Sequence, residues 1–110
     1  TLRDKNMSAL ELALNLHPTP AVCGTPLHAA EDLISSVETD RGFYSGAVGW
    51  CTSDGDGEYM VAIRCAEIAA GGASARAWAG GGIVASSSAD KELAETTAKL
   101  RTIMRALGLQ

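Results

Sequence analysis

The sequence predicts an α+β fold with two helices, then three antiparallel strands, then a longer third helix. Apolar residues recur every three or four positions near both ends of the chain, which indicates helices there. The middle alternates between runs of β-forming residues and two glycine-rich turns. Helices and strands that are grouped in this way, rather than alternating, are typical of the α+β class.

The first helix is expected in residues 6–17, where Met7, Leu10 and Leu14 have helical spacing and Asn6 or Ser8 can cap the start. The segment HPTPAVCGTP follows and stops the helix, because its three prolines and its glycine do not fit regular structure. Pro26 suits the first turn of a second helix, which is expected to extend to residue 38.

Three strands are expected next, with the sequences FYSGAVGWCT, EYMVAIRCAEI and ARAWAGGGIVA. The turns between them are SDGDG and AAGGAS, and the Asp-Gly pairs of the first are strong hairpin signals. The run MVAI is apolar at every position, which is typical of a strand covered on both faces. We therefore expect the sheet to continue into another part of the protein or into a partner.

The longest helix is expected in residues 86–108, with Ser87 or Ser88 as the cap and Gly108 at the end. Helical spacing predicts one buried stripe along it, formed by Leu93, Thr97, Leu100, Met104 and Leu107.

Composition limits the classes of function. The chain has 110 residues, the size of one domain, and with 46% hydrophobic and 20% charged residues it can bury a core. A net charge of −4 argues against a nucleic-acid partner bound by charge, and no apolar run is long enough for a membrane span. The three cysteines form no C-x-x-C pair, so buried thiols in a reducing cytoplasm are expected. The lack of an initiator methionine suggests a piece of a longer polypeptide.

Within the last predicted helix, KELAETTAKL places Glu92, Glu95 and Lys99 on one stripe. One interpretation is a solvated salt-bridge stripe, because acids near a helix start are favoured by the helix dipole. The other is a Mg²⁺ site beside an anion clamp, because Mg²⁺ commonly takes only one or two protein carboxylates. The stripe alone leaves both open.

Three other features could bind an anion. Gly80, Gly81 and Gly82 let the backbone approach a ligand closely, although a strand bulge explains them equally well. Arg64 interrupts an apolar strand and, by strand alternation, lies on a mostly apolar face, which favours a buried anionic partner. His17 precedes a proline at a helix end and alone indicates no catalysis.

Taken together, LHPTPAVCGTP, RGFYSGAVGWCTSDGDGEYMVAIRCAEI, AGGGIVASSS and ELAETTAKL resemble the C-terminal part of the chorismate-utilising enzymes, and among them isochorismate synthases. The resemblance extends from about Leu16 to the end of the chain. It implies that residues 1–110 are the C-terminal segment of a single catalytic domain, an α/β sandwich of two antiparallel sheets with helices outside. It also implies chorismate as substrate and Mg²⁺ as cofactor.

The resemblance also implies roles for individual residues. Glu95 matches a Mg²⁺ ligand, Glu92 an acid that supports the metal site, and Lys99 a lysine near the substrate carboxylate. The other matched positions contact the substrate: Arg64 and Tyr44 around the enolpyruvyl carboxylate, Gly80 and Gly82 through the backbone, Ala21 in the HPTP loop, and His17 beside the ring and its leaving group.

In this family the general base lysine, the general acid glutamate and a further Mg²⁺ glutamate lie earlier in the chain, and Lys5 and Glu11 do not match them. The missing N-terminal part is therefore an implied partner, and the 110 residues alone are expected to be inactive. Anthranilate, aminodeoxychorismate and salicylate synthases remain alternatives, although Ala21 and Leu27 replace a threonine and a lysine of the amine-using relatives. A non-enzymatic fragment that pairs through its exposed sheet is a further alternative. The sequence does not separate a menaquinone from a siderophore pathway.

Overall fold

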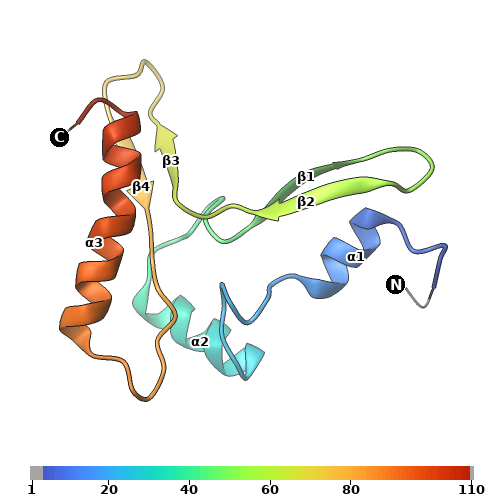
Figure 1. Cartoon of the computed structure of the whole chain (residues 1–110), viewed down its shortest axis with the longest axis horizontal. Helices are drawn as coiled ribbons and strands as arrows, with labels where there is room; N and C mark the ends of the chain where they lie inside the picture. Colours follow the sequence, from blue (N-terminus) through green and yellow to red (C-terminus); the bar gives the residue numbers. More distant parts are fainter. Residues whose placement is uncertain (1–3, 110) are drawn as a thin grey trace. The chain divides into compact units, whose positions relative to one another are not determined.

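The structure is a computed structural model and describes residues 4–109. Within this range Figure 1 shows, in chain order, α1 (Ala9–Leu16), α2 (Leu27–Val37), β1 (Ala47–Cys51), β2 (Gly57–Val61), β3 (Cys65–Ile68), β4 (Ala75–Trp78) and α3 (Ala89–Ala106). This order confirms the α+β class. The described residues form two compact units: unit 1 ends at Ala62, and unit 2 begins at Ile63.

The first helix of unit 1 begins with a capping box. The Ser8 hydroxyl accepts a hydrogen bond from the Glu11 backbone N–H at 3.2 Å, and the Glu11 carboxylate accepts one from the Ser8 N–H at 2.8 Å. These two bonds satisfy backbone donors that a helix start otherwise leaves unpaired. The bond from the Ser8 N–H, together with a second bond from the Ser8 hydroxyl to the same carboxylate, lowers the pKa of Glu11 below its ordinary value. Of the two predicted caps, Ser8 is the one used.

Replacing this cap should weaken the fold measurably. We expect Ser8→Ala to lower the free energy of unfolding by about 1 kcal/mol, because the helix loses its N-terminal hydrogen-bond acceptor. Urea denaturation measures this change. Ser36→Ala, which removes only a hydroxyl bonded to the Leu33 carbonyl on exposed α2, should change it by less than about 0.5 kcal/mol. Equal effects of the two substitutions would contradict the capping role.

The first predicted hairpin is confirmed. Strands β1 and β2 pair antiparallel from Ala47 opposite Val61 to Cys51 opposite Gly57. Gly55 turns the chain with φ of +94°, a conformation that glycine adopts without steric cost. Its carbonyl accepts a hydrogen bond from the Ala9 N–H at 2.9 Å, which fastens the hairpin turn to the start of α1.

The second predicted strand is not continuous. It divides into β2 and β3 because Arg64 has φ of +51°, which an extended strand cannot contain. Strand β3 then pairs antiparallel with β4, from Cys65 opposite Trp78 to Ile68 opposite Ala75. The predicted three-stranded meander is therefore wrong in its strand count: the described residues hold two separate two-stranded sheets.

The third predicted strand is also shorter than expected. Strand β4 ends at Trp78, and residues 79–88 form no helix or strand. The three successive glycines explain the early end, because glycine lacks a side chain to pack and loses the most backbone entropy in a strand. This glycine segment leads to α3 (Figure 1).

The buried face of α3 differs from the predicted stripe. Ile103, 7% exposed, is the one buried side chain among the described residues, whereas Leu93 is 68% exposed and Met104 is 37% exposed. Thr97 is exposed as well, and only two members of the predicted stripe are half-buried, Leu100 and Leu107. The rest of the half-buried face consists of Glu92, Thr96 and Lys99. Polar residues therefore occupy part of the inward face of this helix, which contacts β4.

One face of the β1–β2 hairpin carries exposed apolar side chains. Val48 and Met60 are paired across the strands, and Trp50 lies two residues from Val48, so the three share a face. All three are more than half exposed. The cysteines are free, and Cys51 is exposed rather than buried as expected. No helix in residues 4–109 is long and apolar enough to cross a membrane.

Candidate functional site

Unit 1 contains an open hollow of about 290 Å³. Its lining includes His17 at the end of α1, Val22 in the following loop, and Tyr44 and Ser45 in the loop before β1. Helix α1 places His17 there, because the His17 N–H still bonds to the Ala13 carbonyl while its backbone turns to an extended conformation. Two predicted site residues, His17 and Tyr44, are thus brought together, and Ala21 is exposed on the same loop as Val22.

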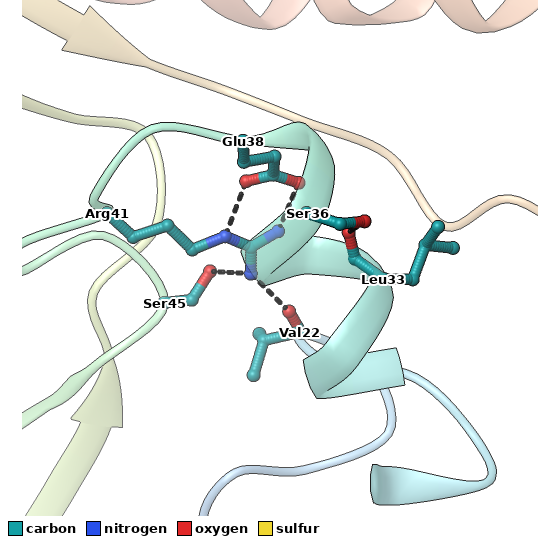
Figure 2. A network of polar contacts seen from close by, with 6 residues as sticks. All are labelled: Val22, Leu33, Ser36, Glu38, Arg41 and Ser45. Atoms are coloured by element: carbon teal, nitrogen blue, oxygen red, sulfur yellow. Dashed lines mark hydrogen bonds and ion pairs between the residues drawn. The ribbon is translucent and has the colours of Figure 1, made fainter. Parts of the chain in front are cut away.

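Arg41 joins three segments around this hollow (Figure 2). Its Nε and Nη2 donate to the two carboxylate oxygens of Glu38, both at 2.6 Å. Its Nη1 donates to the Val22 carbonyl at 3.0 Å and to the Ser45 hydroxyl at 3.3 Å. The guanidinium also lies 5.6 Å from the centre of the Tyr44 ring. The end of α2, the HPTP loop and the loop before β1 are therefore held by one side chain.

The ion pair should make stability depend on acid pH. The hydrogen bonds from Arg41 lower the pKa of Glu38. Because the folded pKa is the lower one, this contribution is present above the ordinary glutamate value of about 4.3 and is lost as pH falls through the folded pKa. We expect the free energy of unfolding to fall more steeply below about pH 4.3 in the unsubstituted protein than in Glu38→Gln, by no more than about 1 kcal/mol for a partly exposed pair. Urea denaturation at pH 7 to 3 measures both profiles, and parallel profiles would refute the role of the pair.

Unit 2 contains a cluster of Glu92, Glu95 and Lys99 on α3, which we name the acid–lysine cluster. The Lys99 Nζ lies 2.5 Å from the Glu95 Oε1 and donates to the Gly80 carbonyl at 2.8 Å. The Ser87 hydroxyl donates to the Glu92 Oε1 at 2.8 Å. The hydrogen bond from Lys99 lowers the pKa of Glu95 below its ordinary value.

The three side chains of the cluster converge on Gly81. A Cβ at this position would lie 3.0 Å from the Glu92 Oε2, 3.8 Å from the Glu95 Oε1 and 3.9 Å from the Lys99 Nζ. The absence of a side chain at Gly81 therefore leaves room for the carboxylates beside the backbone. Gly82, in contrast, has no neighbour within 4 Å of the equivalent point. The predicted stripe thus faces the glycine segment rather than open solvent alone.

The donor set of the cluster fits part of a Mg²⁺ site. No three histidine, cysteine, aspartate or glutamate side chains gather as a metal cage within residues 4–109. Mg²⁺, however, commonly takes one or two protein carboxylates and completes its shell with water and substrate oxygens. Glu92 and Glu95 provide two such carboxylates around Gly81, and the Glu92 Oε2 is turned toward it. The two glutamates could therefore provide only part of the coordination shell, and other ligands would have to complete it.

The position of Arg64 corrects one sequence argument. We expected it to share an apolar strand face and to be buried, but it lies between β2 and β3, is exposed, and has a left-handed backbone. No hydrogen bond or ion pair engages its guanidinium within the part of the chain that the structure describes. Strand alternation does not apply across the break, so the inference of a buried partner is wrong. Its predicted contact with the substrate does not depend on that burial.

Sequence reasoning missed two residues that organise these sites. Arg41 does not figure in the sequence argument, although an acid three residues before a loop arginine signals an ion pair. Ser87 is one of two predicted caps of the last helix, but Ser88 holds the cap position, and the Ser87 hydroxyl instead donates to the Glu92 side chain and accepts from the Val84 N–H at 3.1 Å. No sequence signal distinguishes Ser87 from the two serines beside it.

Comparison with known proteins identifies the family of this chain. Residues 1–108 match the family model described as chorismate binding enzyme, so the chain belongs to that family. MenF of Mycobacterium tuberculosis is 57% identical over 99% of this chain and 29% of its own length. The isochorismate synthase DhbC of Bacillus subtilis is 56% identical over 98% of this chain and 27% of its own length.

A solved structure gives the same result. The crystal structure of DhbC from Bacillus anthracis matches with a TM-score of 0.82 and 44% identity, over 99% of this chain and 29% of that one. The resemblance to the chorismate-utilising family, and to isochorismate synthases within it, is therefore confirmed. The chain spans 27% to 29% of the length of these relatives.

Proposed function

We propose that this chain forms part of an isochorismate synthase, which converts chorismate to isochorismate with Mg²⁺. The acid–lysine cluster is the observation that carries the proposal. It sets two carboxylates and one ammonium group around a bare glycine backbone, in a chain 56% identical to a named isochorismate synthase. A dianionic substrate needs cations and backbone donors, and a metal ion allows carboxylates to take part in binding an anion.

Each proposed role in unit 2 follows from the chemistry of the group. Glu95 is a Mg²⁺ ligand, since its carboxylate lies beside the Gly81 backbone and a hard divalent cation takes carboxylate oxygens. Glu92 supports the metal, with Ser87 fixing one of its oxygens. Bound Mg²⁺ supplies a positive charge that fixes and polarises the substrate carboxylate. Lys99 binds a substrate carboxylate after exchanging its present contact with Glu95, and the Gly80 and Gly82 backbone lies along the substrate.

In unit 1, two of the residues proposed to contact the substrate, His17 and Tyr44, line the hollow. The Tyr44 phenol offers a hydrogen-bond donor to the enolpyruvyl carboxylate. For Arg64, which belongs to unit 2, the proposed role is likewise to donate to the enolpyruvyl carboxylate. His17 lies beside the ring and its leaving hydroxyl, and the small Ala21 side chain contacts the substrate in the HPTP loop. The half-buried position of His17 on the hollow supports this role.

The reaction exchanges one ring hydroxyl for another without net gain of atoms. Water adds to one ring carbon and loses a proton to a general base. A hydroxyl leaves from a second carbon and takes a proton from a general acid, so that one water enters and one leaves. The base and acid positions of the family lie outside these 110 residues, so the chain alone is expected to be inactive. The exposed apolar face of Val48, Trp50 and Met60 supports further protein covering this hairpin in the intact enzyme.

The test is an assay of the intact protein with chorismate. Isochorismate should form with Mg²⁺ and disappear with a chelator, and added ammonia should change neither rate nor product. Anthranilate, aminodeoxychorismate or salicylate as the main product would refute the assignment. Turnover of chorismate by the isolated 110 residues would refute the proposal that the general base and the general acid lie outside this chain. The free cysteines are consistent with our proposal of a cytoplasmic enzyme, because thiols persist in a reducing compartment.

A further inference from the structure

We propose that Arg41 is a positioning residue that fixes the HPTP loop and the turn at Tyr44 for substrate contact. This inference rests on the proposed function, because it assigns the two segments a substrate to hold. The HPTP loop spans residues 17–26, and the turn at Tyr44 lies in residues 38–46. Neither segment contains a helix or a strand. Their geometry therefore needs another source, and the Arg41 network in Figure 2 provides it.

The donors of Arg41 are already committed within the protein. A guanidinium has five N–H groups. Those of Arg41 make four hydrogen bonds: two to the Glu38 carboxylate, one to the Val22 carbonyl and one to the Ser45 hydroxyl. The carboxylate of Glu38 balances its charge at 2.6 Å. An arginine that bound a substrate carboxylate in the hollow would need a free pair of parallel donors. Arg41 lines the hollow without offering such a pair, so its role is to hold protein groups.

The turn beside Tyr44 requires such support. Ser45 has φ of +68°, a left-handed conformation that a non-glycine residue adopts only when its surroundings hold it there. Its N–H donates to the Ala62 carbonyl at 2.8 Å, and its hydroxyl accepts from Arg41. The Tyr44 N–H donates to the Arg41 carbonyl at 2.8 Å. Arg41 thus contacts the turn through both its backbone and its side chain.

The same side chain reaches the loop that follows His17. Its bond to the Val22 carbonyl joins positions 19 residues apart in sequence. Val22 directly follows Ala21 and lies five residues after His17. Loss of this bond would free the HPTP loop to move relative to Tyr44, and small displacements of positioning groups cost large factors in rate.

The test compares three substitutions in the intact enzyme. Arg41→Lys keeps the charge but cannot reproduce the four hydrogen bonds of Arg41, because its ammonium has only three donors on one nitrogen and lacks the planar fork that pairs with both Glu38 oxygens. Glu38→Gln removes the ion pair and keeps the Arg41 side chain, and Ser36→Ala on the same helix is the control. The rate of amide hydrogen exchange in residues 19–24 of the HPTP loop and residues 43–46 of the Tyr44 turn measures how firmly the two segments are fixed. Steady-state kinetics with chorismate and calorimetric titration with Mg²⁺ report its consequence.

For Arg41→Lys we expect exchange in both segments to rise about 10-fold or more, and kcat/KM for chorismate to fall by about 10- to 100-fold, mainly through kcat. Glu38→Gln should give a smaller change in the same direction, and Ser36→Ala none. Mg²⁺ affinity should stay within about 2-fold, since the acid–lysine cluster belongs to unit 2.

Unchanged exchange in both segments of Arg41→Lys would overturn the proposal. A rise in KM alone, with exchange unchanged, would instead make Arg41 a substrate ligand and would also overturn it. If the unsubstituted enzyme does not act on chorismate, the proposed function fails and so does the catalytic consequence drawn from it. The exchange data then still decide whether Arg41 holds the two segments.

Discussion

Glu95→Gln in the intact enzyme should reduce Mg²⁺ affinity by roughly 100-fold or more and remove most turnover at millimolar Mg²⁺. The amide has nearly the shape of the carboxylate and can still accept a hydrogen bond from Lys99, which now contacts the Glu95 Oε1. It lacks the negative charge that a hard divalent cation requires. The substitution therefore removes the proposed metal ligand while leaving the packing of α3 in place.

The matched control is Asp90→Asn, one turn earlier on the same helix. It removes the same charge from the start of α3 and so reproduces any effect on the helix dipole. Asp90 is exposed and lies outside the acid–lysine cluster. Calorimetric titration with Mg²⁺ measures binding without depending on turnover. Unchanged Mg²⁺ affinity in Glu95→Gln, or an equal loss in Asp90→Asn, would remove the metal role of the cluster.

The order of helices and strands could be predicted from local sequence signals. Ser8 was one of two candidate caps for the first helix, and Asp54 with Gly55 marked the first hairpin turn, because capping and turn chemistry act over a few residues. The division at Arg64 could not be predicted, since a left-handed backbone at a non-glycine residue leaves no trace in an apolar pattern. The early end of β4 was partly signalled by Gly80–82, which we included in the strand.

The candidate site, too, could be predicted from the sequence only in part. Helical spacing alone placed Glu92, Glu95 and Lys99 on one stripe, because residues three and four apart are neighbours on a helix. Their convergence on Gly81 depends on how the glycine segment returns to α3, which is a tertiary property. Arg41 pairs locally with Glu38, three residues earlier, but no local pattern predicts its bond to the Val22 carbonyl, 19 residues away. Contacts of this kind are fixed by loop geometry that periodicity does not describe.

Arg64→Gly should raise the stability of the protein while lowering its activity. Arg64 holds φ of +51°, a conformation that costs a non-glycine residue about 1 to 2 kcal/mol and glycine almost nothing. Glycine also makes the unfolded chain more flexible, so we expect a net gain of about 0.5 to 1 kcal/mol in the free energy of unfolding. Urea denaturation measures it. An unchanged or lower stability would show that the backbone at Arg64 is not strained.

The same substitution should lower kcat/KM for chorismate by about 10- to 150-fold, since charge-assisted hydrogen bonds contribute about 1.5 to 3 kcal/mol. Arg64→Lys separates the two effects: it keeps the strain and the charge but loses the bidentate fork, so activity should fall less and stability should not rise. Arg101→Ala, which removes the same charge from exposed α3, should leave both kinetic constants unchanged. The left-handed backbone at the exposed Arg64 is expected to lower the stability of the protein. Full activity in Arg64→Gly would mean that this cost serves something other than the substrate carboxylate.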